Sequence, residues 1–282
     1  MIEIVNGDGK VLYRHDEDGE QTVAAALEAA IEDGADLSGA VFDQQDLRDA
    51  NAEGGRLERA SFRGAELRHA SFEGARLHGA NFDGADLSRS NCEGADLRGA
   101  RLQASELHGA NFEDALLEEA DLRGARGSGA NFERCSLRKA QLSAAQLSGS
   151  NFECARLAGA QLQVADLSRS NLEEADLSAA DLSGCDLRES NLERGNFEQA
   201  TLRGAKLGRS NLSCARFAGA QLEEADGSES NFEHADFSAA QLRGMIARRA
   251  NFERARFSGA AVEGMDARDS NFRGAIGYGR FG

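Results

Sequence analysis

The chain repeats with a period of five residues over most of its length. From Ala35 to Ala275, residues whose numbers end in 0 or 5 are nearly always Ala, Ser, Gly or Cys. Residues whose numbers end in 2 or 7 are nearly always Leu or Phe. The frame holds 48 units, centred from Leu37 to Phe272, without an insertion or a deletion. A period of five fits neither an α-helix nor a plain alternating strand. Each unit must therefore combine a short extended segment with a turn.

The geometry of this unit predicts a coil. The small residue and the large centre are two positions apart, so their side chains point to the same side of an extended segment. Four units then close a square lap of 20 residues, and successive laps stack about 4.8 Å apart. Asn supports this lap length independently, because it recurs every 20 residues at positions 91, 111, 131, 151, 171, 191, 211, 231, 251 and 271. We predict an all-β fold, a four-sided parallel β-helix of about 12 coils.

The unit Ala-[Asp/Asn]-[Leu/Phe]-x-x resembles the pentapeptide-repeat family, and the resemblance covers roughly 85% of the chain. It implies that the β-helix is right-handed and quadrilateral. Characterised members of that family include rod-shaped DNA mimics that bind DNA gyrase or topoisomerase IV and confer resistance to their inhibitors. Some of those members carry projecting loops, which this unbroken frame lacks, and many others have no known activity.

Residues 1–34 lie outside the repeat. Apolar residues flank the turn sequence Asn6-Gly7-Asp8-Gly9, a pattern that predicts a β-hairpin. Val23, Leu27 and Ile31 then follow helical spacing, after Thr22 as N-cap. Because an uncovered coil is an open sheet edge, we expect this segment to cap the first lap. The predicted domains are the cap at 1–34, the β-helix at 35–275 and a C-terminal tail at 276–282.

The C-terminal tail is too short to cover a whole lap, and the last laps are rich in Phe. We expect this end to pair with a second copy across a two-fold axis, giving a homodimer. Members of the family often dimerise through their C-terminal coils, and the resemblance implies the same here. The alternative is a monomer whose tail folds over the end. The expected dimer contacts are Phe252, Phe257, Phe272, Ile276, Tyr278 and Phe281.

The sequence offers no signature of catalysis. The five Cys residues are odd in number and lack a CxxC motif, and three of them (Cys92, Cys135 and Cys185) fall at inward positions. The outward His residues of the repeat are scattered over different laps. We therefore expect no catalytic residue, no metal and no cofactor, and hence no enzyme. No apolar stretch is long enough for a transmembrane helix, and a signal peptide is not recognisable, so we expect a cytoplasmic protein.

Charge points to a protein partner rather than to nucleic acid or membrane. The formal net charge is −16, which argues against direct binding of DNA or RNA. The side that carries the Asn column also carries a Glu in nearly every lap. We call this set the acidic stripe, and it consists of Glu73, Glu93, Glu113, Asp114, Glu133, Glu153, Glu173, Glu174, Glu193, Glu233 and Glu253. With Arg134, Arg194 and Arg254 included, this side has a net charge of −8.

The acidic stripe has two interpretations. In one, the chain is a non-enzymatic DNA mimic whose stripe binds DNA gyrase or topoisomerase IV and protects it from inhibitors, giving antibiotic resistance or self-immunity. In the other, Glu was copied with the 20-residue unit and is a solvated residue without a partner. A different function, a protein-interaction scaffold unrelated to topoisomerases, also fits flat sides without loops.

One column of centres lacks a large side chain at four positions, three of them in the C-terminal laps. Gly127, Gly227, Ala247 and Ala267 stand where Leu is otherwise usual. We expect Phe237 and Phe257 to fill the space; the alternative is a shallow contact surface on that side.

Overall fold

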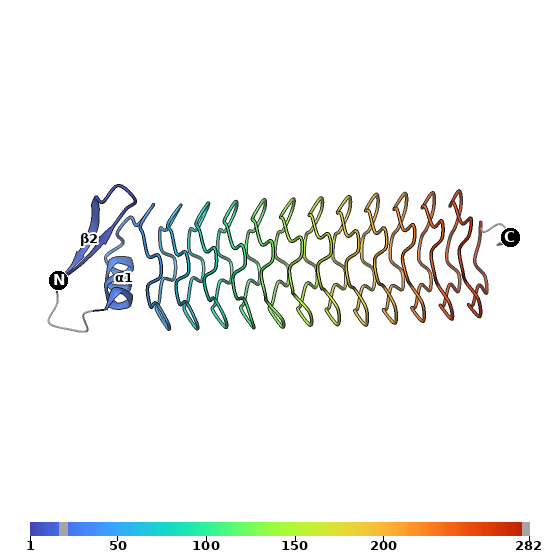
Figure 1. The fold of residues 1–282 in the computed structure, drawn as a ribbon, viewed down its shortest axis with the longest axis horizontal. Helices are drawn as coiled ribbons and strands as arrows, with labels where there is room; N and C mark the ends of the chain where they lie inside the picture. Colours follow the sequence, from blue (N-terminus) through green and yellow to red (C-terminus); the bar gives the residue numbers. More distant parts are fainter. Residues whose placement is uncertain (17–21, 278–282) are drawn as a thin grey trace. The chain divides into compact units, whose positions relative to one another are not determined.

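The N-terminal residues form a hairpin. In the computed structural model, which describes residues 1–16 and 22–277, strand β1 (Ile2–Val5) pairs antiparallel with strand β2 (Val11–His15) (Figure 1). The turn between them is closed by Asn6, whose Oδ1 accepts the backbone N–H groups of Asp8 and Lys10 at 3.1 and 2.9 Å. An Asn side chain that satisfies turn N–H groups in this way is the physical reason for its preference in turns.

Helix α1 (Val23–Glu32) follows the hairpin. Its N-cap is Thr22, whose Oγ1 accepts the N–H of Ala25 at 3.1 Å. Beyond the helix, Gly34 takes a left-handed φ of +68°, a conformation that glycine adopts without steric cost. The side of α1 that carries Ala26, Leu27 and Ala30 is buried.

The repeating part is built on parallel backbone bridges between residues 20 apart, which confirms the predicted lap. The four ladders of the first lap start with the pairs Asp36–Arg56, Val41–Ser61, Asp46–Glu66 and Asn51–Ser71. Each unit contributes a single bridge residue and then a turn, so the sides are shorter than ordinary strands. The chain forms two compact units, Met1–Gln141 and Leu142–Gly282, and the same 20-residue bridging occurs within each of them.

Backbone hydrogen bonds between laps have a direction. Leu57 and Arg59 donate their N–H groups forward to the carbonyls of Arg76 and His78, both at 2.9 Å. In return, only Arg76 donates backward, to the carbonyl of Gly55 at 2.8 Å. Each side of a lap thus sends two N–H groups toward the C-terminal neighbour and one toward the N-terminal neighbour. The C-terminal edge of a lap is consequently richer in donors than in acceptors.

The interior is a stack of identical layers. In the first unit, the rings of Phe42, Phe62 and Phe82 lie parallel, with centroids 5.0 and 4.9 Å apart. In the second unit, Phe217 and Phe237 repeat this stacking at 4.9 Å. These spacings equal the separation of hydrogen-bonded strands, so within each unit every lap adds one layer to the core. The inward Cys residues are buried in it as predicted: Cys92, Cys135 and Cys185.

The Gly227 position is filled by its neighbours. A methyl group added there would lie 2.8 Å from Cζ of Phe232 and 2.9 Å from Cε of Met245. Phe232 and Met245 are thus the nearest side chains at Gly227, and Phe237 lies edge-on to Phe232 at 5.5 Å; filling of the column by Phe237 and Phe257 stays a prediction.

The hairpin and α1 contact the first lap directly. The N–H of Val41 donates to the carbonyl of Val5 at 2.9 Å, and the N–H of Asn51 donates to Oε1 of Glu28 at 2.9 Å. Both N–H groups point toward the N-terminus, where no earlier lap exists to accept them. None of the helices in the described part of the chain is long and apolar enough to cross a membrane.

Candidate partner-binding surface

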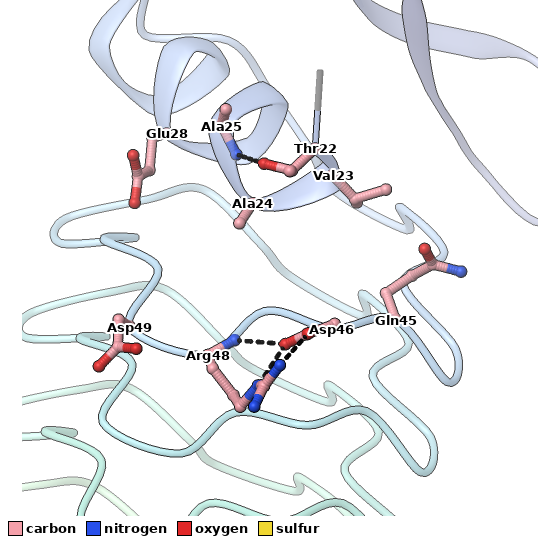
Figure 2. Close-up of a pocket in the computed structure, with 9 residues that line it drawn as sticks. All are labelled: Thr22, Val23, Ala24, Ala25, Glu28, Gln45, Asp46, Arg48 and Asp49. Atoms are coloured by element: carbon pink, nitrogen blue, oxygen red, sulfur yellow. Dashed lines mark hydrogen bonds and ion pairs between the residues drawn. The ribbon is translucent and has the colours of Figure 1, made fainter. Parts of the chain in front are cut away.

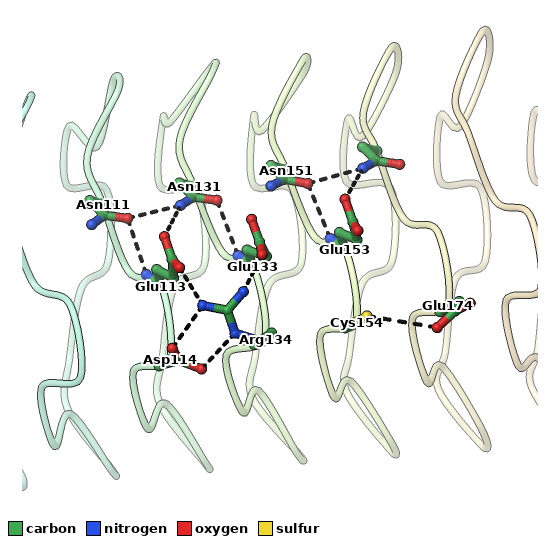
Figure 3. Close-up of polar contacts among 11 residues, drawn as sticks. Asn111, Glu113, Asp114, Asn131, Glu133, Arg134, Asn151, Glu153, Cys154 and Glu174 are labelled. Carbon is green, nitrogen blue, oxygen red and sulfur yellow. Dashed lines mark hydrogen bonds and ion pairs between the residues drawn. The ribbon is translucent and has the colours of Figure 1, made fainter.

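The Asn column forms a hydrogen-bonded ladder. In the first unit, Asn131 donates from Nδ2 to Oδ1 of Asn111 at 2.9 Å, one lap away (Figure 3). Oδ1 of Asn111 also accepts the backbone N–H of Glu113 at 3.2 Å. In the second unit, Asn171 donates to Oδ1 of Asn151 in the same way at 3.2 Å. The amide can donate and accept at once, and this is why Asn suits a repeating ladder.

The same amides hold the carboxylates of the acidic stripe. The second hydrogen of Asn131 Nδ2 donates to Oε2 of Glu113 at 3.2 Å. In the second unit, Asn191 donates to Oε2 of Glu173 at 3.1 Å. Each carboxylate is thereby oriented through one oxygen, while Oε1 stays available to other groups. The Glu113 side chain is 29% exposed, whereas Glu73, Glu93, Asp114 and Glu174 are exposed, so the stripe combines half-buried and exposed carboxylates.

Arg134 neutralises part of the stripe in the first unit. Its guanidinium contacts Glu113 and Glu133, and it donates to Asp114 through Nε and Nη2 at 3.0 and 2.9 Å (Figure 3). The hydrogen bonds from Arg134 lower the pKa of the Asp114 carboxyl. Contact with these carboxylates in turn raises the pKa of Arg134. Three acids and one Arg thus form a cluster with a net charge of −2.

Arg194 has the corresponding place in the second unit. It lies 3.2 Å from Glu173, 3.7 Å from Glu174 and 3.2 Å from Glu193. Toward the C-terminus, Arg273 donates to Oε1 of Glu253 and lowers the pKa of that carboxyl.

Other positions of the stripe have no Arg partner among the described residues. Glu73, Glu93 and Glu153 each accept an Asn Nδ2, at 3.1, 3.3 and 3.0 Å, and form no ion pair among the described residues. Glu233 lies 3.7 Å from the ring of His234. The negative potential is therefore uneven, strongest where no Arg is near.

The outward Cys residues belong to the same side. Cys154 and Cys214 are exposed. Sγ of Cys154 lies 3.9 Å from Oε2 of Glu174 (Figure 3). The inward thiols differ, because burial raises the pKa of Cys92 to about 12 and makes it unreactive at neutral pH.

The predicted dimer residues fall into three groups. Phe252 and Phe257 are fully buried and stack on neighbouring rings, so they are core residues and cannot contact a partner directly. Ile276 is 51% exposed and Phe272 is partly exposed. Tyr278 and Phe281 lie outside the described residues. The homodimer stays a prediction, with Phe272 and Ile276 as its available contacts.

A hollow of about 640 Å³ lies between the first turn of α1 and the first lap (Figure 2). Its polar lining includes Glu28, Asp46, Arg48 and Asp49. Hydrogen bonds from Arg48 lower the pKa of Asp46 to about 2, so this carboxyl is ionised at neutral pH and unsuited to be a general acid. Within the described residues, no group of His, Cys, Asp and Glu side chains could hold a metal ion.

The repeat frame, the 20-residue ladders and the buried Leu and Phe centres together define a family. The family model of pentapeptide repeats matches segments that run from residues 33–64 to 235–274. The chain belongs to the pentapeptide-repeat family. The right-handed β-helix of this family accounts for the laps, and its members are generally structural or interaction proteins.

Solved structures of other pentapeptide-repeat proteins are similar to this chain. HetL of the cyanobacterium Nostoc sp. strain PCC 7120, involved in regulation of heterocyst differentiation, is 29% identical, with 89% of this chain and 95% of HetL covered and a TM-score of 0.36. QnrB1, a plasmid-mediated fluoroquinolone resistance protein, is 17% identical, with 78% and 86% covered and a TM-score of 0.22. Rfr23 of the cyanobacterium Cyanothece 51142 is 26% identical, with 39% and 63% covered and a TM-score of 0.27. No curated protein matches the sequence.

Two features of this pentapeptide-repeat surface escaped the sequence analysis. The first is the hydrogen bond that most Asn residues of the column donate to the Glu of the previous lap, 18 residues earlier. A signal for it exists, since Asn and Glu recur together at the same period. The second is the contact of Arg134 with three acids, which depends on side-chain directions that a sequence does not display.

Proposed function

We propose that this chain is a non-enzymatic DNA mimic that binds a type II topoisomerase, DNA gyrase, and protects it from inhibitors. The acidic stripe is the surface that would occupy a basic DNA-binding groove of that enzyme. A cytoplasmic location, with access to gyrase, is part of the proposal. The proposal also includes antibiotic resistance or self-immunity as the consequence of this protection. Topoisomerase IV is proposed as a related partner.

The observation that carries this proposal is the fixation of the stripe carboxylates by the Asn ladder. A free Glu side chain loses rotamer freedom when it binds, at a cost of about 0.5–1.5 kcal/mol. Glu93 and Glu153 already accept an Asn Nδ2, at 3.3 and 3.0 Å, and need less ordering. A row of oriented anions of this kind resembles a nucleic-acid backbone more closely than a set of mobile Glu side chains does.

The distribution of Arg indicates where the partner binds. Glu93 in the first unit and Glu153 in the second form no ion pair among the described residues, whereas Glu113 and Glu173 are paired with Arg134 and Arg194. A cation of the partner gains more from an unpaired carboxylate, since it need not displace an Arg. We therefore expect Glu93 and Glu153 to contribute most to the binding of the partner.

A supercoiling assay tests the proposal. Purified gyrase is assayed with and without a fluoroquinolone, and the protein at micromolar concentration should restore supercoiling in the presence of the drug. The double variant Glu93→Gln/Glu153→Gln should lose this effect, because the amide keeps the size but not the charge. The matched control, Glu119→Gln/Glu224→Gln, removes two exposed charges outside the stripe and should protect as the unaltered protein does. Failure of the unaltered protein to protect would refute the proposal.

The competing function is an interaction scaffold with another partner. A pull-down from the lysate of the host that returns a different protein and no gyrase would favour it. The two functions share the same fold, so only the identity of the bound protein separates them.

The organisation of the chain is also part of the proposal. We infer that residues 1–34 cap the first lap, that 35–275 form a β-helix of about 12 coils, and that 276–282 form the tail. The bonds from Val41 to Val5 and from Asn51 to Glu28 support the cap, because they satisfy N–H groups at the start of the first lap. Light scattering of the purified protein decides whether the predicted homodimer forms.

A further inference from the structure

Within residues 1–16 and 22–277, the last lap ends in a row of backbone N–H groups that have no acceptor. One lap earlier, Leu242 and Gly244 donate their N–H groups to the carbonyls of Ala261 and Glu263, at 2.7 and 3.1 Å. The equivalent N–H groups of the last lap find no acceptor in the part of the chain that the structure describes. They belong to Val262, Gly264, Ala267, Asp269 and Gly274. An edge of this kind is a template for pairing with another extended chain.

Arginine side chains surround one part of this edge. Arg248, Arg249 and Arg268 line a hollow of about 430 Å³ together with Ser228 and Asp269. Residues 241–276 carry seven Arg and four acids, a net charge of +3 in a chain of net −16. The C-terminal laps are therefore opposite in charge to the protein as a whole.

These arginines keep donors for a ligand. Arg248 contacts Asp266 through Nε at 2.6 Å, and among the described residues neither of its Nη groups forms a hydrogen bond. Arg268 uses Nε and Nη2 on the same carboxylate, at 2.8 Å each, and retains Nη1. Its side chain is 69% exposed.

The edge also has an apolar component. Val262 and Ala267 are partly exposed, although the corresponding centres of earlier laps are buried. Ile276, which follows these two residues in the chain, is 51% exposed. A partner can therefore bury apolar side chains as well as satisfy the N–H groups.

We propose that this C-terminal edge docks an acidic polypeptide segment in an extended conformation. The carbonyl groups of the segment accept the N–H groups of Ala267 and Asp269, as in the addition of a strand to a sheet edge. Its carboxylates bind the guanidinium groups that line the hollow, since Arg and carboxylate form charge-assisted bonds with matching geometry. Its alternate apolar side chains cover the exposed centres. This interaction is separate from the acidic stripe and goes beyond the proposed function.

A second copy of the chain fits these backbone N–H groups less well than an acidic segment does, so we expect the predicted homodimer to form through Phe272 and Ile276 rather than through this backbone edge. When two C-terminal edges face each other across a two-fold axis, each offers more backbone N–H donors than carbonyl acceptors, so many donors stay unpaired. They also present a net positive charge to a net positive charge, which is unfavourable across an interface. An acidic segment is complementary in both respects.

The test uses the full chain and a fluorescent peptide of alternating Glu and Val, followed by anisotropy. Arg248→Gln/Arg268→Gln should weaken binding by about tenfold or more, as expected for loss of charged partners at an interface. The control Arg169→Gln/Arg203→Gln removes two arginines that are paired with Glu189 and Glu223 away from this edge, and should bind as the unaltered protein does. Circular dichroism confirms that both variants are folded.

A peptide of alternating Glu and Pro separates strand pairing from simple charge attraction. It carries the same charges, but every second residue lacks an N–H group and its φ is fixed near −65°, which disfavours a β-strand, so it should bind about tenfold more weakly. Equal binding of both peptides would overturn the strand-pairing geometry. Absence of binding, or equal binding by the edge variant, would overturn the proposal.

Discussion

Asn131 donates from Nδ2 to Oε2 of Glu113 across 3.2 Å, and this single contact links the fold of the protein to its charge. The amide belongs to the ladder that joins successive laps, and the carboxylate belongs to the acidic stripe. The residue that stabilises the stack of laps thus also orients the anions on its surface.

Loss of a ladder amide should destabilise the coil. Asn111 bonds to Asn91 and Glu93 through Nδ2, at 3.1 and 3.3 Å, and its Oδ1 accepts from two further groups. We predict that Asn111→Ala lowers the free energy of unfolding in urea by about 1–3 kcal/mol, the cost of unpaired groups in a partly buried site. Asn81→Ala, which removes one bond to the N–H of Asp83, is the control and should cost less. Equal losses would contradict the role of the ladder.

The space beside Gly227 should not tolerate a methyl group. An added Cβ would approach Phe232 at 2.8 Å, and this ring is held by its stacking on Phe252 at 4.9 Å. We predict that Gly227→Ala lowers the free energy of unfolding by about 1–3 kcal/mol through overpacking. The matched change Gly208→Ala meets its nearest atom at 3.4 Å and should be neutral or slightly stabilising. Thermal unfolding of the two variants provides the comparison.

Replacement of Val164 should increase the stability of the protein. It is a β-branched residue in the left-handed region, with φ of +53°, and it is 64% exposed. Asn tolerates this conformation better, so Val164→Asn should raise the free energy of unfolding by about 1 kcal/mol. Val41→Asn changes an exposed Val whose φ is not positive and should give no gain. A loss of stability in the first variant would show that Val164 is not strained.

The pKa of Asp46 provides a pH test. Hydrogen bonds from Arg48 lower it to about 2, whereas an unfolded Asp titrates near 3.9. The carboxylate therefore stabilises the fold above about pH 3.9, and this contribution is lost as the pH falls through about 2. Titration followed by NMR of the Asp46 carboxyl carbon should show the low value. Arg48→Gln should move it toward 3.9, and Arg63→Gln should leave it unchanged.

Thiol reactivity should follow the repeat frame. In the native protein, a maleimide should modify Cys154 and Cys214, which are exposed. The buried Cys92, Cys135 and Cys185 should react only after unfolding, because burial raises their pKa values. Mass spectrometry counts the additions, and rapid modification of a buried thiol would contradict the inward assignment.

The fold was largely predictable because one physical rule is repeated. Small and large residues two positions apart determine the inward set, and the column of Asn determines the lap. The ends were less predictable, since they do not repeat: Phe252 and Phe257 were expected at a dimer contact and are core residues. The charge of the stripe, including the Arg residues on the same side, followed from the repeat frame. Its fixation by Asn and its neutralisation by Arg134 depend on contacts between laps, which are visible only in three dimensions.

Competition with DNA tests the central claim most directly. Gyrase bound to a fluorescent DNA duplex is titrated with the protein, and release of the duplex is followed by anisotropy. If the oriented carboxylates mimic DNA, the protein should release the duplex at micromolar concentration. The concentration needed should be at least about tenfold higher for Glu93→Gln/Glu153→Gln than for Glu119→Gln/Glu224→Gln. Retention of the duplex at saturating protein, or equal release by both variants, would contradict the account.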